Sequence, residues 1–217
     1  MVFRMSARTN LLIQAEKVFN AFGYRRTSMG EVAKVAGVSR QGLYHHFPNK
    51  PALFVAVMTR GHTETVNQSI EARDAARARG ADFEAIVTAM LDARFGTMLR
   101  WMRTTPHWGE IFEEVTRRCA QVVLEQTLRF NRLLTELVQN EIESGRLELA
   151  EGVTPEELAA AFSTAARGVN LNYPPPDTAT VHVEYERHVR LLMCGANRKR
   201  VKTVRLSAVL PQNTVRA

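Results

Sequence analysis

Three polar side chains, Gln41, Tyr44 and His45, share one side of a short stretch, opposite two large apolar residues. At the 100° step of an α-helix, Phe47 falls on the same side as Leu43, and the three polar residues fall on the other. A helix anchored by its apolar side leaves its polar side free to contact a partner. Because glutamine can hold adenine N6 and N7 with two hydrogen bonds, the chemistry available here is the reading of base edges in DNA.

The preceding residues predict a second short helix and a tight turn that position this one. Ser28 and Glu31 have the capping-box spacing of a helix start. Gly37 suits the left-handed residue that ends a helix, and Ser39 can accept from the free N–H groups of a helix that begins at Arg40. Two short helices joined by such a turn form the arrangement that places one helix in a DNA groove.

From Ala15 to Phe54, and above all through GYRRTSMGEVAKVAGVSRQGLYHHFPNKPALF, the sequence resembles the DNA-binding domain of the TetR (tetracycline-repressor-like, TetR/AcrR) family of bacterial transcription regulators. From about residue 55 onward, the chain resembles the family only in its length and in its helical pattern. The resemblance implies an all-α fold of about nine helices. It implies an N-terminal three-helix DNA-binding domain with a helix-turn-helix, joined to a helical domain that binds an effector and dimerises.

By this resemblance, the second helix of the pair faces the major groove of double-stranded DNA. Arg40 at its start can donate two parallel hydrogen bonds to guanine O6 and N7. Gly30 stands where the family often has a longer polar side chain, so the first helix is expected to contact only the DNA backbone. The alternatives are a half-buried packing role for Tyr44 and an inward position for His46. The residues expected to contact DNA are Ser28, Ser39, Arg40, Gln41, Tyr44, His45, His46 and Lys50.

Charge is divided unevenly along the 217 residues. Residues 1–50 carry eight Lys and Arg against two Asp and Glu, residues 196–217 carry six against none, and the whole chain has a net charge of +7. The middle is therefore acidic, and the basic ends suit a polyanion such as DNA. We expect a DNA-binding domain at 1–50, an effector-binding and dimerisation domain at 51–195, and a basic, flexible tail at 196–217. The alternative for the tail is an auxiliary contact with nucleic acid.

Hydrophobic periodicity predicts helices throughout the chain. The expected ranges are 9–22, ending at Gly23, then the two short helices, and a long helix from Pro51 to about residue 73 that joins the two domains. Further helices are expected at 83–103, from Pro106, at about 119–144, from Pro155 after a capping box at Thr154, and at about 177–193. The first helices are expected to close over Phe19, Phe22, Val32, Leu43 and Phe47.

Several other classes of protein are disfavoured by the sequence. No apolar run approaches the roughly 20 residues that a bilayer requires, and no secretory signal is evident, so we expect a cytoplasmic protein without a membrane partner. Cys119 and Cys194 are expected to be reduced structural thiols. A redox sensor is the alternative, and it would require a lowered thiol pKa, with only Arg117 and Arg118 beside Cys119 to lower it.

An enzyme and an architectural DNA protein are the alternative functions. His182 with Glu186, and Glu184 with His188, have a spacing that could hold a divalent metal, but no third ligand is evident. We therefore expect no metal, no cofactor and no enzymatic activity. A ligand-independent nucleoid-binding protein would suit the basic tail, and it would show little preference between DNA sequences.

The domain after residue 50 has two further sets of candidate residues. One is rich in methionine and aromatic residues, which suit an adaptable apolar pocket for a small-molecule effector, although each could simply be core. That set is His62, Phe95, Met98, Trp101, Met102, His107, Trp108, Phe112, Phe130 and Asn131, with Arg94 as a further polar candidate. The other set, expected to pair with a second copy of the chain, is Leu158, Phe162, Ala165, Val169, Val181, Tyr185, Val189 and Leu192.

The function expected from this interpretation is that of a homodimeric repressor. It would bind a pseudo-palindromic operator and be released by a small apolar or amphipathic effector.

Overall fold

The computed structural model describes residues 6–172, 174 and 176–197, and within these ranges the fold is all α, as predicted. Sheet-type pairing among the described residues is limited to an isolated antiparallel bridge between Leu149 and Asn197. The predicted basic tail lies almost wholly outside them. The elements are α1 (Ala7–Arg26), α2 (Met29–Val35), α3 (Arg40–His46), α4 (Lys50–Ala78), α5 (Phe83–Leu91), the π-helical segment η1 (Asp92–Gly96), α6 (Thr97–Thr104), α7 (Trp108–Arg118), α8 (Ala120–Glu143), α9 (Pro155–Asn170) and α10 (Val181–Ala196).

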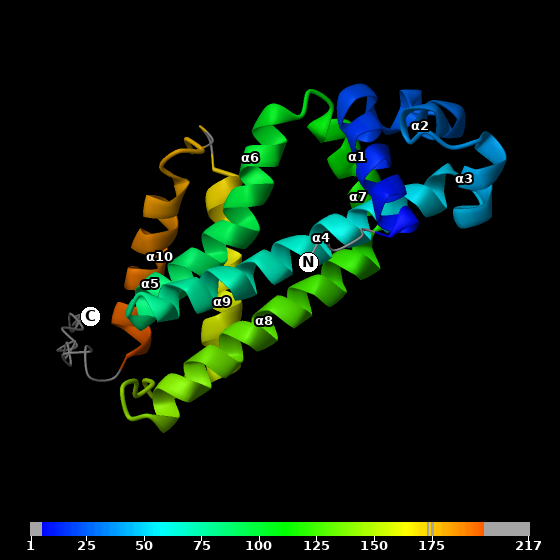
Figure 1. Cartoon of the computed structure of the whole chain (residues 1–217). Helices are drawn as coiled ribbons and strands as arrows, with labels where there is room; N and C mark the ends of the chain where they lie inside the picture. The colour runs from blue at the N-terminus through cyan, green and yellow to red at the C-terminus, as the bar shows by residue number, and fades with distance from the viewer. Residues whose placement is uncertain (1–5, 173, 175, 198–217) are drawn as a thin grey trace, which may run out of the picture.

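The molecule is elongated, with α1, α2 and α3 at one end and α9 and α10 at the other (Figure 1). We call the first three helices the head and the remainder the body. The long helix α4 leaves the head and crosses into the body beside α8 (Figure 1). It is continuous over 29 residues, with Asn49 as its N-cap and Pro51 in its first turn, where proline lacks only an N–H that would have no partner.

The core of the head depends on residues far along the chain. Phe19, Val32, Leu43 and Phe47 are buried as predicted, but Phe22 is 51% exposed, on the outer side of α1. The same cluster takes in side chains from α4, from α7 and from the residue before α8, namely Leu53, Phe54, Val57, Ile111 and Cys119. The head is therefore packed together with part of the body.

The core of the body lies between α5, α8, α9 and α10. These helices bury one continuous cluster, in which Phe130, Phe162 and Tyr185 are fully enclosed. Burial of such side chains contributes roughly 1.5–3 kcal/mol each. The Tyr185 hydroxyl donates to Asn170 Oδ1 at 2.6 Å, and Asn170 in turn donates to the Phe95 carbonyl at 2.8 Å, so these two buried side chains have hydrogen-bond partners.

The predicted helix at 83–103 is continuous but not uniform. Asp92–Gly96 form a π-helical segment, which inserts one extra residue per turn and changes the direction in which the following side chains point. A Cβ at residue 96 would overlap Asp92 Oδ1, so this packing requires glycine there. Arg100 Nη1 forms an ion pair with the same Asp92 Oδ1 atom at 3.2 Å. The hydrophobic pattern gave no indication of the segment.

No helix within the described part of the chain is both long and apolar enough to cross a lipid bilayer.

Candidate nucleic-acid interface

The helix α3 is held in place by the residues that the sequence predicted. Ser28 Oγ accepts from Glu31 N at 3.2 Å and the Glu31 carboxylate accepts from Ser28 N at 2.7 Å, which completes the capping box of α2. Gly37 has a φ of 68° in the turn. Ser39 Oγ then accepts from Gly42 N at 3.0 Å and starts α3. The predicted local structure is confirmed.

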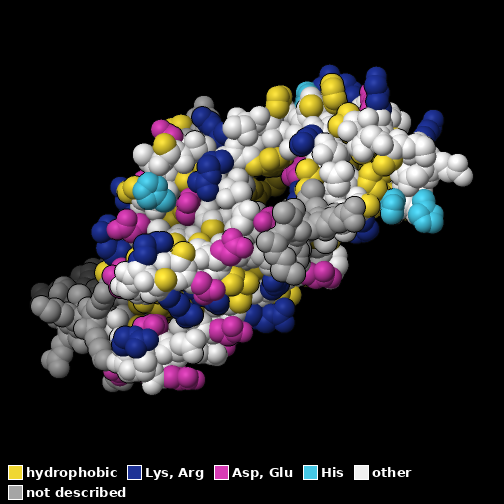
Figure 2. Space-filling model, in the orientation of Figure 1, with side chains coloured by type: hydrophobic (Ala, Val, Ile, Leu, Met, Phe, Trp, Pro, Cys, Tyr) yellow, Lys and Arg dark blue, Asp and Glu magenta, His cyan; other side chains and the backbone are white. Residues whose placement is uncertain are grey.

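The polar side of α3 faces solvent. Arg40, Gln41, Tyr44 and His45 are all exposed, while Leu43 on the opposite side is fully buried. The Arg40 guanidinium lies 5.7 Å from the centre of the Tyr44 ring, which orders two of these side chains relative to each other. His46 is exposed as well, beside His45. Figure 2 shows histidine and basic side chains around this end of the molecule, whereas acidic side chains are concentrated over the body.

Lys50 has a different position from the one expected of a phosphate contact. Its ammonium group donates to the carbonyls of Tyr24, Arg25 and Thr27 at 3.0, 3.3 and 2.9 Å. It also lies 4.6 Å from the centre of the Tyr24 ring. The three donors of the ammonium group are therefore directed at the end of α1, where the lysine fixes the loop before α2.

Contacts between the head and α7 were not predicted. Glu110 Oε1 accepts from Arg25 N at 2.5 Å, and an Arg26 Nη2 group lies 2.9 Å from His107 Nε2. Gly23 makes the approach of Glu110 possible, since its φ is 77° and a Cβ there would lie 2.7 Å from Glu110 Oε2. No sequence pattern links residues separated by 85 positions, so only the structure reveals this junction.

Ion pairs within α7 lie beside the same junction, where the Arg118 guanidinium is 5.1 Å from the centre of the Tyr24 ring of the head. Glu114 is 1% exposed and binds Arg118 at 2.6 Å and, at short range, Arg117. Burial raises the pKa of Glu114, but the bonds and charges of these two arginines outweigh it, so the pKa is lowered overall. Next to it, burial raises the pKa of the Cys119 thiol, which is the opposite of what a redox sensor requires.

The predicted effector residues are not brought together at one place. Trp108 and Phe112 are exposed on α7, His107 meets the head, and the Trp101 indole donates to Asn20 of α1 at 3.2 Å. Asn131 accepts from Ser163 at 2.6 Å in the α8–α9 contact. Met98 and Met102 lie on α6, partly buried and buried respectively. His62, Phe95 and Phe130 do converge around Arg94, in the space between α4, η1 and α8.

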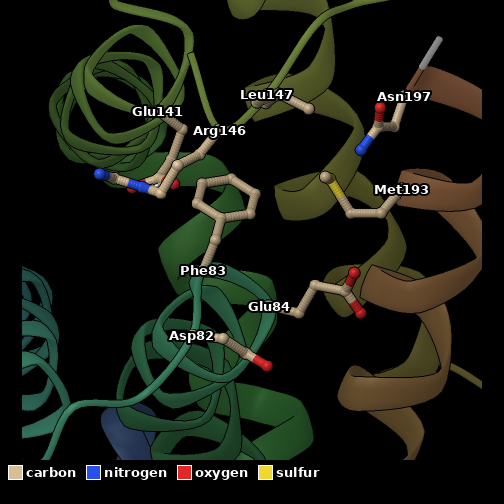
Figure 3. A pocket seen from close by; sticks show the side chains of 8 residues that line it. All are labelled: Asp82, Phe83, Glu84, Glu141, Arg146, Leu147, Met193 and Asn197. Carbon is tan, nitrogen blue, oxygen red and sulfur yellow. Dashed lines mark hydrogen bonds and ion pairs between the residues drawn. The ribbon is translucent and has the colours of Figure 1, made fainter. Parts of the chain in front are cut away.

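Two surface cavities lie elsewhere. A groove of about 930 Å³ runs between α1, α4 and α7 and is lined by residues such as Leu12, Val55, Thr59 and Arg118. A smaller cleft of about 120 Å³ lies at the far end of the body, where Phe83 points toward Leu147 beside Arg146 (Figure 3). None of the predicted effector residues lines either of these two cavities.

Most of the predicted dimer residues belong to the core of their own chain. Leu158, Phe162, Val169, Val181, Tyr185 and Val189 are each at most 3% exposed and pack between α9, α10 and α5. They are not available to a partner. Periodicity identified the apolar sides of α9 and α10 but not what covers them. Only Ala165 and Leu192 retain partial exposure, and the exposed apolar residues of this region are Leu171, Val183 and Leu191.

One of the two suggested metal pairs on α10, Glu184 with His188, makes other contacts. A ring nitrogen of His188 lies 2.8 Å from the Glu184 carbonyl, and Arg187 binds the Glu184 carboxylate at 3.2 Å.

Comparison with known proteins agrees with the geometry of the head. Residues 11–57 match the family model described as bacterial regulatory proteins, tetR family. The transcriptional activator FasR of Mycolicibacterium smegmatis is 46% identical over 57 residues, 26% of each chain. The transcriptional regulator YhgD of Bacillus subtilis is 27% identical over 139 residues, 64% of this chain and 69% of YhgD. The sequence match thus spans about a quarter of FasR and about two thirds of YhgD.

Solved structures resemble the fold of the whole chain. A transcriptional regulator from a Rhodococcus species superposes with a TM-score of 0.66 at 17% identity, covering 88% of this chain and 98% of its own. The TetR-family regulator PfmR from Thermus thermophilus superposes with a TM-score of 0.56 at 18% identity, covering 85% and 97%. All four of these similar proteins are described as transcriptional regulators. The capped helix-turn-helix of the head is therefore similar to the DNA-binding domain of the tetR family of bacterial regulatory proteins, and the all-α fold of the chain resembles that of solved transcriptional regulators.

Proposed function

We propose that this protein is a homodimeric transcriptional repressor that binds a pseudo-palindromic operator and is released from it by a small effector. The observation that carries the proposal is the outward presentation of Arg40, Gln41, Tyr44 and His45 on a helix whose other side is locked into the head. Bidentate contacts from the first two side chains give about 1–3 kcal/mol of discrimination each. Ser28 and Ser39, exposed at the starts of α2 and α3, supply contacts to phosphates.

One head offers few base contacts, so tight binding requires two heads related by two-fold symmetry. We assign the dimer contact to the outer sides of α9 and α10. There Leu171 is 71% exposed and Leu191 is 62% exposed, and Ala165 and Gly168 allow a second helix to approach closely. This outer face takes the place of the residues predicted from the sequence, such as Phe162 and Tyr185, which are buried inside their own chain.

Release of the repressor from its operator depends on α4, which attaches the head to the body. The α4 helix packs against α1 at its beginning and against α5, η1 and α8 further along. An effector that binds the body in only one position of α4 changes the separation of the two heads, with a coupling of about 1–3 kcal/mol. Because bound repressor occupies the promoter, transcription increases when effector is added.

Selection of genomic fragments by the purified protein, followed by footprinting, tests the proposal. We expect a protected pseudo-palindrome and a loss of about 10- to 100-fold in affinity for Gln41→Ala, confined to particular base pairs. A reporter gene under the selected promoter gives the sign of regulation. Equal binding to unrelated sequences at matched salt would instead indicate an architectural protein.

The dimer assignment has its own test. Leu191→Glu places a charge on the proposed α9–α10 contact, and we expect a monomer by analytical ultracentrifugation with much weaker operator binding. Leu124→Glu is the matched control, since this leucine is 50% exposed on α8, away from the contact. A dimer that persists in the first variant and dissociates in the second would move the interface to α8.

A further inference from the structure

Arg94 is a buried cation that the protein leaves almost without hydrogen bonds. Its side chain belongs to η1 and the residue is 6% exposed. The buried Nε atom has no hydrogen-bond partner. Nη1 makes one long contact, 3.4 Å from Thr65 Oγ1 on α4. A guanidinium has five N–H donors, so most of its donor capacity is unused here.

The surroundings of Arg94 do not compensate its charge. Within the described ranges no carboxylate forms an ion pair with it, and the charges that act on it are those of Arg167 and Arg129, both positive. Burial, followed by these two charges, lowers the pKa of Arg94 to about 10, which leaves it charged at neutral pH. An isolated buried charge is strongly unfavourable unless something pairs with it.

The other groups around the guanidinium are apolar rings and neutral polar side chains. It lies 5.1 Å from the centre of the Phe130 ring and 5.5 Å from that of Phe95, and the two rings meet edge to face. Burial, and then the Arg94 charge, lowers the pKa of His62 to about 4, so this imidazole is neutral at pH 7 and can donate one hydrogen bond and accept another. Such a set complements a molecule with one anionic head and an apolar body.

We propose that Arg94 binds the charged head of an organic acid, with the apolar part of that molecule against Phe95 and Phe130 and with Thr65 and His62 of α4 beside the head. The proposal rests on the effector-dependent regulation put forward above, and it specifies the chemical class of the effector. An acid at this place contacts η1, α8 and α4 together, so its binding acts directly on the helix that carries the head.

Pairs of matched compounds test the proposal on the full-length protein. Binding of decanoate and 1-naphthoate is measured by calorimetry and by the shift in Tm, against the neutral decan-1-ol and 1-naphthalenemethanol, with sodium sulfate as a plain anion. We expect at least one acid to bind at least tenfold more tightly than its alcohol, and sulfate to have no specific effect. The two acids distinguish an aliphatic body from an aromatic one.

Two variants complete the experiment. Arg94→Met is expected to weaken acid binding at least tenfold and to leave the Tm of the unliganded protein unchanged or higher, because it removes an unpaired buried charge. Arg132→Gln removes an exposed charge on α8 and is expected to bind acid as the unmodified protein does. A Tm that falls by several degrees in Arg94→Met would show a structural cation and overturn the proposal, as would acids that bind no better than their alcohols or do not bind at millimolar concentration.

Two separate measurements on the unmodified protein, operator binding and acid binding, distinguish a failure of this inference from a failure of the proposed function. Operator binding in the absence of any acid tests the regulator alone. If a specific operator is found and no acid binds, only the assignment of the effector class fails. If an acid binds at Arg94 but no specific DNA site exists, the regulator proposal fails and the anion site stands.

Discussion

At the scale of single residues, the basic and polar side chains near the DNA-reading helix divide between solvent and their own chain. Arg40 and Gln41 at the start of α3 are exposed. Lys50 has the right chemistry for a phosphate, but its ammonium group is directed at backbone carbonyls of α1. Whether a basic side chain faces DNA or its own chain depends on tertiary contacts that local spacing does not contain.

Lys50→Met is expected to destabilise the protein by about 1–3 kcal/mol, because it removes charge-assisted bonds to the Tyr24, Arg25 and Thr27 carbonyls. The midpoint of urea unfolding measures the change. Lys34→Met is the control, since Lys34 is exposed on α2. An unchanged midpoint, together with uniformly weaker binding to all DNA sequences, would instead identify Lys50 as a phosphate contact.

His62 gives the stability a defined pH dependence. Its pKa is about 4 in the folded protein and near 6.5 when exposed, so the unfolded state binds the extra proton between these values. The contribution of neutral His62 to the free energy of unfolding is therefore fully present above pH 6.5 and is lost as the pH falls toward 4. The loss is at most about 1.4 kcal/mol per pH unit. Urea unfolding of His62→Gln is expected to show a flatter pH profile than the unmodified protein. His182→Gln, with an exposed ring, should keep the original profile.

At the scale of elements, the caps and turns could be predicted from the sequence, but departures from regular α-helix inside a helix could not. Ser28, Ser39 and Thr154 all cap helices as expected, because capping depends on neighbours within three residues. The π-helical segment at Asp92–Gly96 shows the opposite case. It depends on how Asp92, Gly96 and Arg100 pack together, and that packing has no counterpart in hydrophobic periodicity.

Two glycines in long helices are expected to respond oppositely to alanine. Gly23→Ala forces a side chain into a left-handed conformation and against Glu110, so we expect a loss of about 1–3 kcal/mol. Gly61→Ala, in the middle of α4 with open space around it, is expected to stabilise by up to about 1 kcal/mol. Urea unfolding compares the two, and similar shifts in both would contradict the structure at Gly23.

At the scale of the whole molecule, the fold class was predictable but the division into domains was not fully specified. The first domain was expected at 1–50, and the core of the head also includes Ile111 and Cys119. A helical pattern shows which side of a helix is apolar, but it does not show which distant helix covers that side. The same limitation explains why the apolar sides of α9 and α10 were taken for a dimer contact.

Ile111 provides a test of this shared core. Ile111→Ala is expected to destabilise the protein by about 2–5 kcal/mol and to accelerate amide hydrogen exchange in α1, α2 and α3, although the residue lies on α7. Phe112→Ala is the matched control, because the neighbouring phenylalanine is 42% exposed and should cost little. Unaltered exchange in the first three helices would mean that the head is stable by itself.

The unbroken length of α4 has a geometric consequence. A helix of 29 residues is about 43 Å long at roughly 1.5 Å per residue. If one end pivots by about 5°, the other end is displaced by about 4 Å, which is close to the roughly 3.4 Å rise of one base pair. A pivot of this size at the body end of α4 is therefore enough to put a reading helix out of step with its half-site.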